Sequence, residues 1–329
     1  MIINKFLETY NHSRFHMPGH RGCPWHKSIE HRFDITEIDG AGDLYSTAGL
    51  IAESEQTYSR FSENGAYTIY SAGGSTLCIQ TMIALLKSKG VTCIAAYNDY
   101  HVALKNACDL LEVKLLETPN EIPPHTEALW VTSPTYLGDI KDIENIAEQC
   151  RKNGTLLAVD NAHGAHLFAN HPMLLGADIC NDSAHKTLPC LTGGAFLHIK
   201  ESFASKQEAK EAMFRFGSTS PSYLILASLE QSAEYLNTKA EADFKKLAKT
   251  YKELYELAAK NGFEQQPKNN DVTKFILHKN GKSGADIAKA LRSRKIEPEL
   301  VGERFVLLML SPFNKKKDYK KLKSFFKTF

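Results

Sequence analysis

Between about residue 68 and residue 236, the sequence alternates between short apolar segments and longer amphipathic ones. The apolar segments are four or five residues long, as is typical of strands that helices cover on both faces; they occupy 93–97, 128–132, 156–159 and 195–199. The amphipathic segments have helical spacing and occupy 76–89, 140–153 and 223–236. Strands separated by such helices form βαβ units. We therefore predict an α/β fold, a three-layer sandwich with a mainly parallel sheet.

The last third of the sequence has a different pattern. Residues 240–260 are rich in Lys, Glu, Ala and Leu and predict one long amphipathic helix, which Asn261-Gly262 ends. Shorter strand-like and helix-like segments follow it. We therefore predict a large domain over residues 1–260, including an N-terminal arm with a helix at 2–10, and a small α+β domain over 261–329.

Composition excludes several classes of protein. Hydrophobic residues make up 43% of the chain and charged residues 24%, which is ordinary for a globular protein. Lys and Arg number 40 against 38 Asp and Glu, so we expect no nucleic-acid partner. The seven cysteines form no Cys-x-x-Cys pair, which favours a reduced cytoplasmic protein without a metal site. The sequence contains neither a secretory signal pattern nor a long apolar run, so we expect no membrane association.

The strongest chemical signal is the segment from Asp182 to Thr187, which reads Asp-Ser-Ala-His-Lys-Thr and precedes Gly193-Gly194. A lysine can form a Schiff base when burial or nearby positive charge keeps its amine neutral. Adjacent hydroxyls and an imidazole could bind phosphate and move protons. By itself the motif favours a surface lysine, because most lysines in proteins are exposed.

A second signal is the apolar segment 156–159, which ends in Asp160. A carboxylate there would lie at the carboxyl edge of a parallel sheet, where α/β proteins bind ligands. It could keep the ring nitrogen of pyridoxal 5′-phosphate (PLP) protonated, so that the ring accepts electrons. A turn or helix cap is an equally good interpretation of Asp160. His163 could likewise line a site or cap a turn.

Two weaker signals precede these. The segment 71–76 reads Ser-Ala-Gly-Gly-Ser-Thr and leads into a predicted helix, where free amides and hydroxyls could bind a phosphate. His101, just beyond the strand at 93–97, could stack on a pyridine ring, although such a histidine is more often structural. The order of phosphate loop, aromatic ring, strand-end Asp160 and then Lys186 favours a PLP enzyme in which Lys186 is the Schiff-base lysine.

With these motifs in place, the sequence resembles the Orn/Lys/Arg decarboxylase family of fold-type-I PLP enzymes. The resemblance spans most of residues 15–225, and the His-Met-Pro-Gly-His run at 16–20 and the Ser-Ala-His-Lys run at 183–186 are specific together. The matching stretches are 15–22, 34–37, 73–76, 133–138, 160–164, 183–186 and 218–223.

The resemblance implies a role for each candidate residue. Lys186 would carry PLP as a Schiff base, Asp160 would pair with the ring nitrogen, His101 would stack on the ring, and His185 would shuttle protons. The cofactor would also contact Ala162 and His163. The phosphate would be bound by hydroxyls, which are those of Ser75, Thr76 and Ser183, together with Thr219 or Ser220 of a neighbouring subunit. The resemblance therefore implies a homodimer with shared active sites.

The expected reaction is decarboxylation of an amino acid, and the resemblance favours a basic one: lysine, ornithine or arginine. Two alternatives remain open: another PLP reaction (transamination, racemisation or elimination), or a PLP-binding regulatory subunit without turnover. Asn161 departs from the carboxylate of many relatives, and the sequence ends at Phe329, whereas larger relatives continue into a further domain. No residue is assigned to the far end of the substrate; Glu37 and Asp43 lie in glycine-rich loops and are more typical of turns. The role of the loop at 16–22 is also open.

Overall fold

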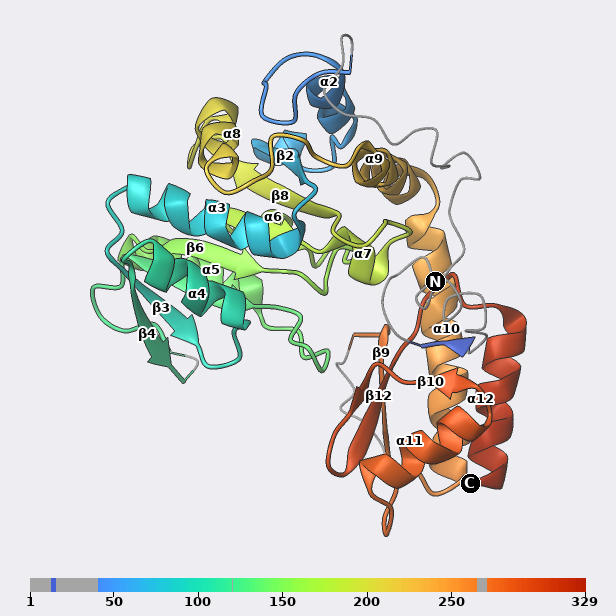
Figure 1. Cartoon of the computed structure of the whole chain (residues 1–329). Coiled ribbons are helices and arrows are strands. Elements are labelled where there is room, and N and C mark those ends of the chain that lie inside the picture. Colours follow the sequence, from blue (N-terminus) through green and yellow to red (C-terminus); the bar gives the residue numbers. More distant parts are fainter. Residues whose placement is uncertain (1–12, 16–40, 120, 265–270) are drawn as a thin grey trace.

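The structure is a computed structural model that describes residues 13–15, 41–119, 121–264 and 271–329 (Figure 1). The predicted helix at 2–10, the loop at 16–22 and Glu37 lie outside the described residues. The described residues form a seven-stranded sheet flanked by helices and a smaller antiparallel sheet. The predicted α/β sandwich with a small α+β unit is therefore confirmed.

The large sheet has the strand order β2-β8-β7-β6-β5-β3-β4. The strands from β7 to β4 are parallel, whereas β8 runs antiparallel to both β7 and β2. Each of the four predicted strands is present within one residue of its predicted bounds. The strands are β2 Ala66–Ser71, β3 Cys93–Tyr97, β4 Lys114–Thr118, β5 Ala128–Thr132, β6 Leu156–Asp160, β7 Ile179–Asp182 and β8 Ala195–Lys200.

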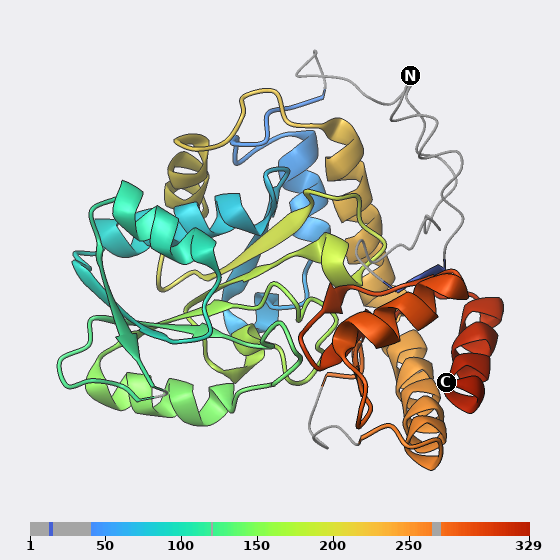
Figure 2. The same ribbon diagram turned by 60° about the horizontal axis from the view of Figure 1, so that its bottom comes forward.

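Helices cover both faces of this sheet (Figure 2). One face packs against α3 Gly74–Ser88, α4 Val102–Leu110 and α8 Lys206–Phe214. The other face packs against α2 Leu50–Thr57, α5 Ile143–Asn153, α6 Pro172–Leu175 and α9 Tyr223–Thr238. A 3₁₀ turn, η2, occupies Ser62–Asn64, and the short helix α7 occupies Ala184–Thr187.

Successive residues of the central strand β5 belong to different hydrophobic cores. Ala128 and Trp130 pack with α3 and α4, whereas Leu129 and Val131 pack with α5. All four side chains are fully buried, because side chains alternate between the faces of a strand and both faces here are covered. This double burial explains why the central strands are short, continuous apolar runs.

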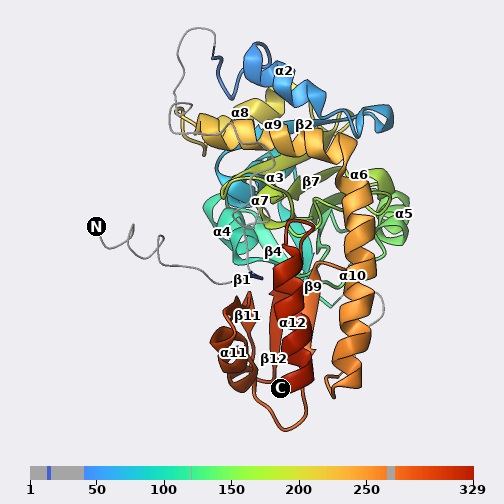
Figure 3. The same cartoon turned by 90° about the vertical axis from the view of Figure 1, so that its right-hand side faces the viewer.

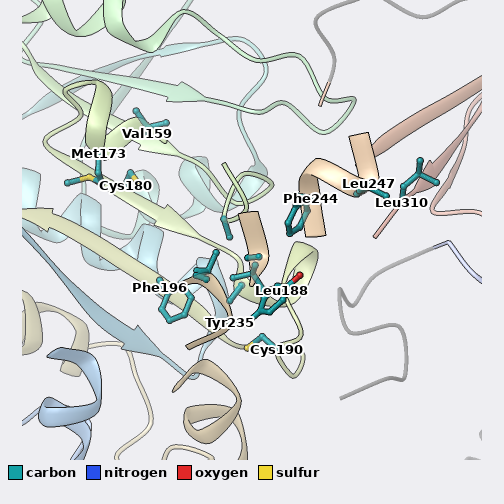
Figure 4. Packing of buried hydrophobic residues seen from close by; sticks show 14 of the residues in the cluster. Val159, Met173, Cys180, Leu188, Cys190, Phe196, Tyr235, Phe244, Leu247 and Leu310 are labelled. Carbon is teal, nitrogen blue, oxygen red and sulfur yellow. The ribbon is translucent and has the colours of Figure 1, made fainter. Parts of the chain in front are cut away.

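The core on the α5 side continues beyond the large sheet. Figure 4 shows Val159 of β6 and Phe196 of β8 together with Tyr235 of α9. The same cluster includes Phe244 of the following helix and Leu310, just after the last strand of the small sheet. The two units are thus joined by one hydrophobic core.

The long helix α10, Ala240–Lys260, contacts both α9 and α12 (Figure 3). It leads the chain into the small unit. The antiparallel sheet of this unit has the order β11-β12-β9. The predicted domain boundary after residue 260 remains a prediction. The remaining elements are β1 Ser13–Arg14, β9 Lys274–His278, α11 Gly284–Ser293, β10 Ile296–Glu297, β11 Leu300–Val301, β12 Phe305–Met309 and α12 Lys316–Thr328.

Two further observations concern the described part of the chain. None of its helices combines the length and the apolar content that a membrane crossing requires. Six cysteines fall within it, each as a free thiol.

Candidate active site

A cavity of about 420 Å³ lies at the carboxyl ends of the parallel strands. Thr132 ends β5, Asp160 ends β6 and Ser183 follows β7, so three neighbouring strands deliver side chains to the same place. The structure brings together most of the predicted site residues, and those that line this cavity are Ser75, Thr76, His101, Asp160, Ala162, His163, Ser183, His185 and Lys186. This is the edge at which α/β proteins bind ligands.

One end of the cavity is formed by hydroxyl groups and the start of α3. The Ser75 and Ser183 Oγ atoms are 2.6 Å apart, which joins the first turn of α3 to the residue that follows β7. Gly74 has φ +69° and donates its backbone N–H to the Gly193 carbonyl at 2.7 Å. The first backbone amides of a helix lack intrahelical partners, so this end of the cavity suits an anion such as a phosphate.

Asp160 is 2% exposed and is fixed through one oxygen. Its Oδ1 accepts hydrogen bonds from the Ala162 backbone N–H at 3.1 Å and from the Asn181 Nδ2 at 3.0 Å. The bond to Ala162 is the turn interaction that the sequence left open. Asp160 also lines the cavity, so its side chain both stabilises a turn and faces the site.

Lys186 projects from α7 into the same cavity. Its Nζ lies 3.1 Å from the His163 Nε2. Burial lowers the pKa of Lys186, while the negative charges of Asp160 and Glu299 oppose this shift. A lowered pKa increases the fraction of neutral amine, which is the nucleophilic form of a lysine.

His163 connects Lys186 to a second lysine. The His163 Nδ1 lies 2.7 Å from the Nζ of Lys274, which is 0% exposed at the start of β9. The pKa of His163 is lowered well below its ordinary value, first by burial and then by the charges of Lys274 and Lys186. The ring of Tyr136 packs edge-on against His163, with centroids 5.2 Å apart, and its hydroxyl donates to Glu299 at 2.9 Å.

Several of these groups have no role predicted from the sequence. Tyr136 lies within a stretch that resembles the decarboxylase family, which was the available signal. Lys274 and Glu299 belong to the small unit, and no local pattern distinguishes them from surface residues. The cavity-lining side chains that sequence reasoning missed are Ile79, Asp99, Tyr100, Thr132 and Tyr136.

The two other histidines of the site are each held by the backbone. His101 caps α4, where its Nδ1 accepts from the Ala103 N–H at 3.1 Å, and it also lines the cavity. The structural and the functional interpretations of His101 are therefore compatible. The His185 Nδ1 donates to the Gly194 carbonyl at 3.2 Å, and burial lowers its pKa. A neutral His185 would present Nε2 as a proton acceptor.

Thr219 and Ser220 are not among the residues that line the cavity. Both are exposed, and Ser220 lines a neighbouring cavity of about 240 Å³, of which Thr76 is also a wall. Asp43 does not line the main cavity either. Its Oδ1 accepts from the Tyr45 N–H at 2.8 Å, as expected of a turn residue.

Asn161 points away from the site and toward a buried carboxylate. Its Nδ2 donates to the Asp182 Oδ1 at 2.5 Å, and the Nε2 atoms of His171 and His198 lie 3.1 and 3.0 Å from the Asp182 Oδ2. Burial would raise the pKa of Asp182, but the two imidazoles hold it below its ordinary value. An amide at position 161 can donate to this carboxylate, whereas a second carboxylate there would repel it.

We predict that Asp182→Ala lowers the free energy of unfolding by about 3 kcal/mol, because it leaves three buried donors without their acceptor. Urea denaturation measures this change. Asp139→Ala removes an exposed carboxylate and should change stability by less than about 0.5 kcal/mol. Equal stability of the two variants would contradict a stabilising role for the Asp182 cluster.

The sequence profile of the family described as Orn/Lys/Arg decarboxylase, major domain, matches residues 100–273. The chain belongs to the Orn/Lys/Arg decarboxylase family. As a member of this family, it is a PLP-dependent amino-acid decarboxylase.

Two relatives from Bacillus subtilis (strain 168) match nearly the whole chain. The uncharacterized protein YaaO is 29% identical over 343 residues, which cover 91% of this chain and 71% of YaaO. An arginine decarboxylase is 26% identical over 360 residues, which cover 94% of this chain and 72% of that enzyme. Among solved structures, the lysine decarboxylase LdcF of Francisella novicida superposes with a TM-score of 0.73 at 17% identity. That match covers 88% of this chain and 52% of LdcF.

The cavity fits PLP, the cofactor of the family. Its volume lies within the range of about 300–1,000 Å³ that is usual for small-molecule and cofactor sites. The Thr132 Oγ1 is buried and has no hydrogen-bond partner within the described residues, so a polar group remains available to a ligand. The hydroxyls suit the phosphate of PLP, and the buried carboxylate of Asp160 suits its ring nitrogen. Lys186, with its lowered pKa, suits the aldehyde.

Proposed function

We propose that this member of the Orn/Lys/Arg decarboxylase family removes the α-carboxylate of a basic amino acid: arginine, lysine or ornithine. The observation that carries the proposal is the convergence of Lys186, Asp160 and the Ser75–Ser183 hydroxyl pair on one cavity. The match to an arginine decarboxylase over 94% of the chain supports a basic substrate. The products would be the corresponding amine and CO₂.

Each residue has a proposed task. Lys186 would bind PLP covalently, Asp160 would pair with its ring nitrogen and His101 would lie against the ring. The hydroxyls of Ser75, Thr76 and Ser183 would bind the phosphate. When bound, PLP supplies the electron sink that decarboxylation requires. Lys186, or His185 after it has taken up a proton at Nε2, would then deliver the proton that replaces the carboxylate.

The test is CO₂ release from arginine, lysine and ornithine, each offered separately to the purified protein loaded with PLP. We expect release from one of the three, with the matching amine formed in equal amount. The blank contains the amino acid and free PLP without protein, because free PLP itself reacts with amino acids. Absence of release from all three substrates would contradict the proposal.

The same samples distinguish the other PLP reactions. A ketoacid product would indicate transamination, loss of optical activity without CO₂ would indicate racemisation, and release of a side-chain fragment would indicate elimination. Covalent PLP binding without any reaction would favour a regulatory subunit. The fold alone does not choose among these reactions.

The hydroxyl at position 183 gives a separate prediction. Because Ser183 is buried beside Ser75, Ser183→Ala should raise the dissociation constant of PLP about tenfold, the effect of losing one hydrogen bond to a charged group. Titration of the PLP-free protein, followed by absorbance, measures this constant. Ser88→Ala, at the exposed far end of α3, serves as the control and should leave PLP affinity unchanged.

We also propose that the active protein is a homodimer in which Thr219 or Ser220 reaches the partner's phosphate site. Their exposure, and the cavity that Ser220 shares with Thr76, support this arrangement. Light scattering during size-exclusion chromatography should give about twice the chain mass of 36.8 kDa. A monomer with full activity would contradict shared sites.

A further inference from the structure

We propose that Lys274 is a positioning residue that keeps Lys186 in its free-amine form by fixing the tautomer of His163. This inference rests on the proposed role of Lys186 as the lysine that binds PLP. It adds a contribution from the small unit to a site that is otherwise built at the edge of the large sheet. It also explains why a lysine is buried at the start of β9, where a strand would ordinarily bury an apolar side chain.

The three side chains form a continuous path. The Lys274 Nζ lies 2.7 Å from the His163 Nδ1, and the His163 Nε2 lies 3.1 Å from the Lys186 Nζ. Lys274 is fully buried and His163 is 5% exposed, so water has little access to either group. The edge-on ring of Tyr136 further restricts the orientation of the imidazole.

Hydrogen-bond chemistry allows only certain protonation states along this path. A neutral imidazole has one N–H donor and one nitrogen acceptor, whereas an ammonium group can only donate. If Lys274 is an ammonium, the His163 Nδ1 must accept from it, and the proton of the ring must reside on Nε2. The Nε2–H then points at Lys186, which can receive it only as a neutral amine with a free lone pair.

The surroundings favour placing the positive charge on Lys274. Its contact with His163 is the shorter of the two, as expected of a charge-assisted bond. The Lys274 Nζ also lies 5.7 Å from the centre of the Tyr136 ring, a distance at which a cation is attracted to the ring. Moreover, Lys274 contributes to lowering the pKa of buried Asp271, after the larger effect of His166.

Other charged groups face the same path and must be included. Asp160 and Glu299 favour a protonated Lys186 and therefore oppose the effect of Lys274. His101 and His166 face His163 and, like the two lysines, favour its neutral form. A second positive charge on Lys186 would place two ammonium groups on opposite sides of one buried imidazole. Repulsion between them therefore also favours a neutral Lys186.

The consequence is that Lys186 is already a neutral, nucleophilic amine in the PLP-free protein. Covalent attachment needs the neutral amine, and an ammonium at position 186 would first have to lose its proton. Lys274 would thus act on attachment through His163, without itself touching the cofactor.

The experiment is competitive labelling of the PLP-free protein with a trace of acetic anhydride across a pH series. Mass spectrometry of the peptides gives the labelling midpoint of each lysine. In the wild-type protein, we expect Lys186 to become reactive at lower pH than Lys274. In Lys274→Met, which retains length but removes the charge, the Lys186 midpoint should rise by about one pH unit or more. Lys274→Arg should restore most of the wild-type midpoint, and Lys279→Met, elsewhere in the small unit, should not change it.

Three results would overturn the inference. They are a wild-type Lys274 that titrates below Lys186, a wild-type Lys186 that titrates with the exposed lysines, and an unchanged Lys186 midpoint in folded Lys274→Met. The first two results come from the wild-type protein, so the inference can be tested even if Lys274→Met does not fold. Failure of the proposed role of Lys186 looks different, since PLP would then not attach to Lys186 in the wild-type protein at any pH.

Discussion

Lys186→Ala should reduce the rate of CO₂ release by at least about 1,000-fold, because it removes the amine that binds PLP covalently and a candidate proton donor. The absorbance band of the lysine-bound cofactor should disappear in the same variant. PLP should still bind noncovalently, since the hydroxyl groups of Ser75 and Ser183 remain in place. Steady-state rates, absorbance spectra and equilibrium dialysis measure these three properties.

The matched control is Lys105→Ala, which removes an exposed lysine from α4, the helix whose N-cap His101 lines the cavity. Its rate and its spectrum should match those of the wild-type protein. Borohydride reduction followed by peptide mapping identifies the lysine that carries the cofactor. Modification of any lysine other than Lys186 would contradict the assignment.

Asp160→Asn should lower kcat by about 100- to 1,000-fold, while PLP remains covalently attached to Lys186. Asparagine has the same shape as aspartate but carries no negative charge to hold a proton on the ring nitrogen. The fold should be preserved, because the side-chain carbonyl of asparagine can still accept from the Ala162 N–H and the Asn181 amide.

Two further variants separate the charge of Asp160 from its position. Asn181→Ala removes one of the two bonds to the Asp160 Oδ1, so it should reduce kcat less than Asp160→Asn does. Asp139→Asn changes an exposed carboxylate and should have no effect. If Asp160→Asn turned over at the wild-type rate, Asp160 would be only the turn residue that its bond to Ala162 suggests.

The central fold was predictable from the sequence because both faces of the sheet are covered. Continuous burial requires continuous apolar runs, and β3 and β5 were therefore predicted with their observed bounds. The strand β4 was not predicted, because it is an edge strand whose side chains are largely exposed and no apolar run marks it. The strand β7, Ile179–Asp182, was also not predicted, because buried Asn181 and Asp182 interrupt its apolar pattern. Asn181 donates to Asp160 of the site, and Asp182 is the carboxylate of the buried cluster described above.

The candidate site was predictable where a local motif carries it. Lys186, Asp160 and Ser75 each follow a strand or open a helix, so sequence position already indicates the sheet edge. Lys274 and Glu299 reach the site only because α10 leads the chain into the small unit. There, Lys274 contacts His163, which follows β6, and Glu299 accepts from Tyr136, which follows β5. Contacts of this kind depend on tertiary structure, which no short pattern records.

The pairing of β1 with β10 has a consequence for the order of folding. Ser13 pairs with Ile296, and its Oγ donates to the Asp318 Oδ1 across 305 positions of sequence. The segment at 13–15 therefore leaves the ribosome long before its partners exist. The large sheet needs none of these contacts and can assemble first, during synthesis. Closing so long a loop is slow, so we expect docking of this segment to be among the last steps of folding.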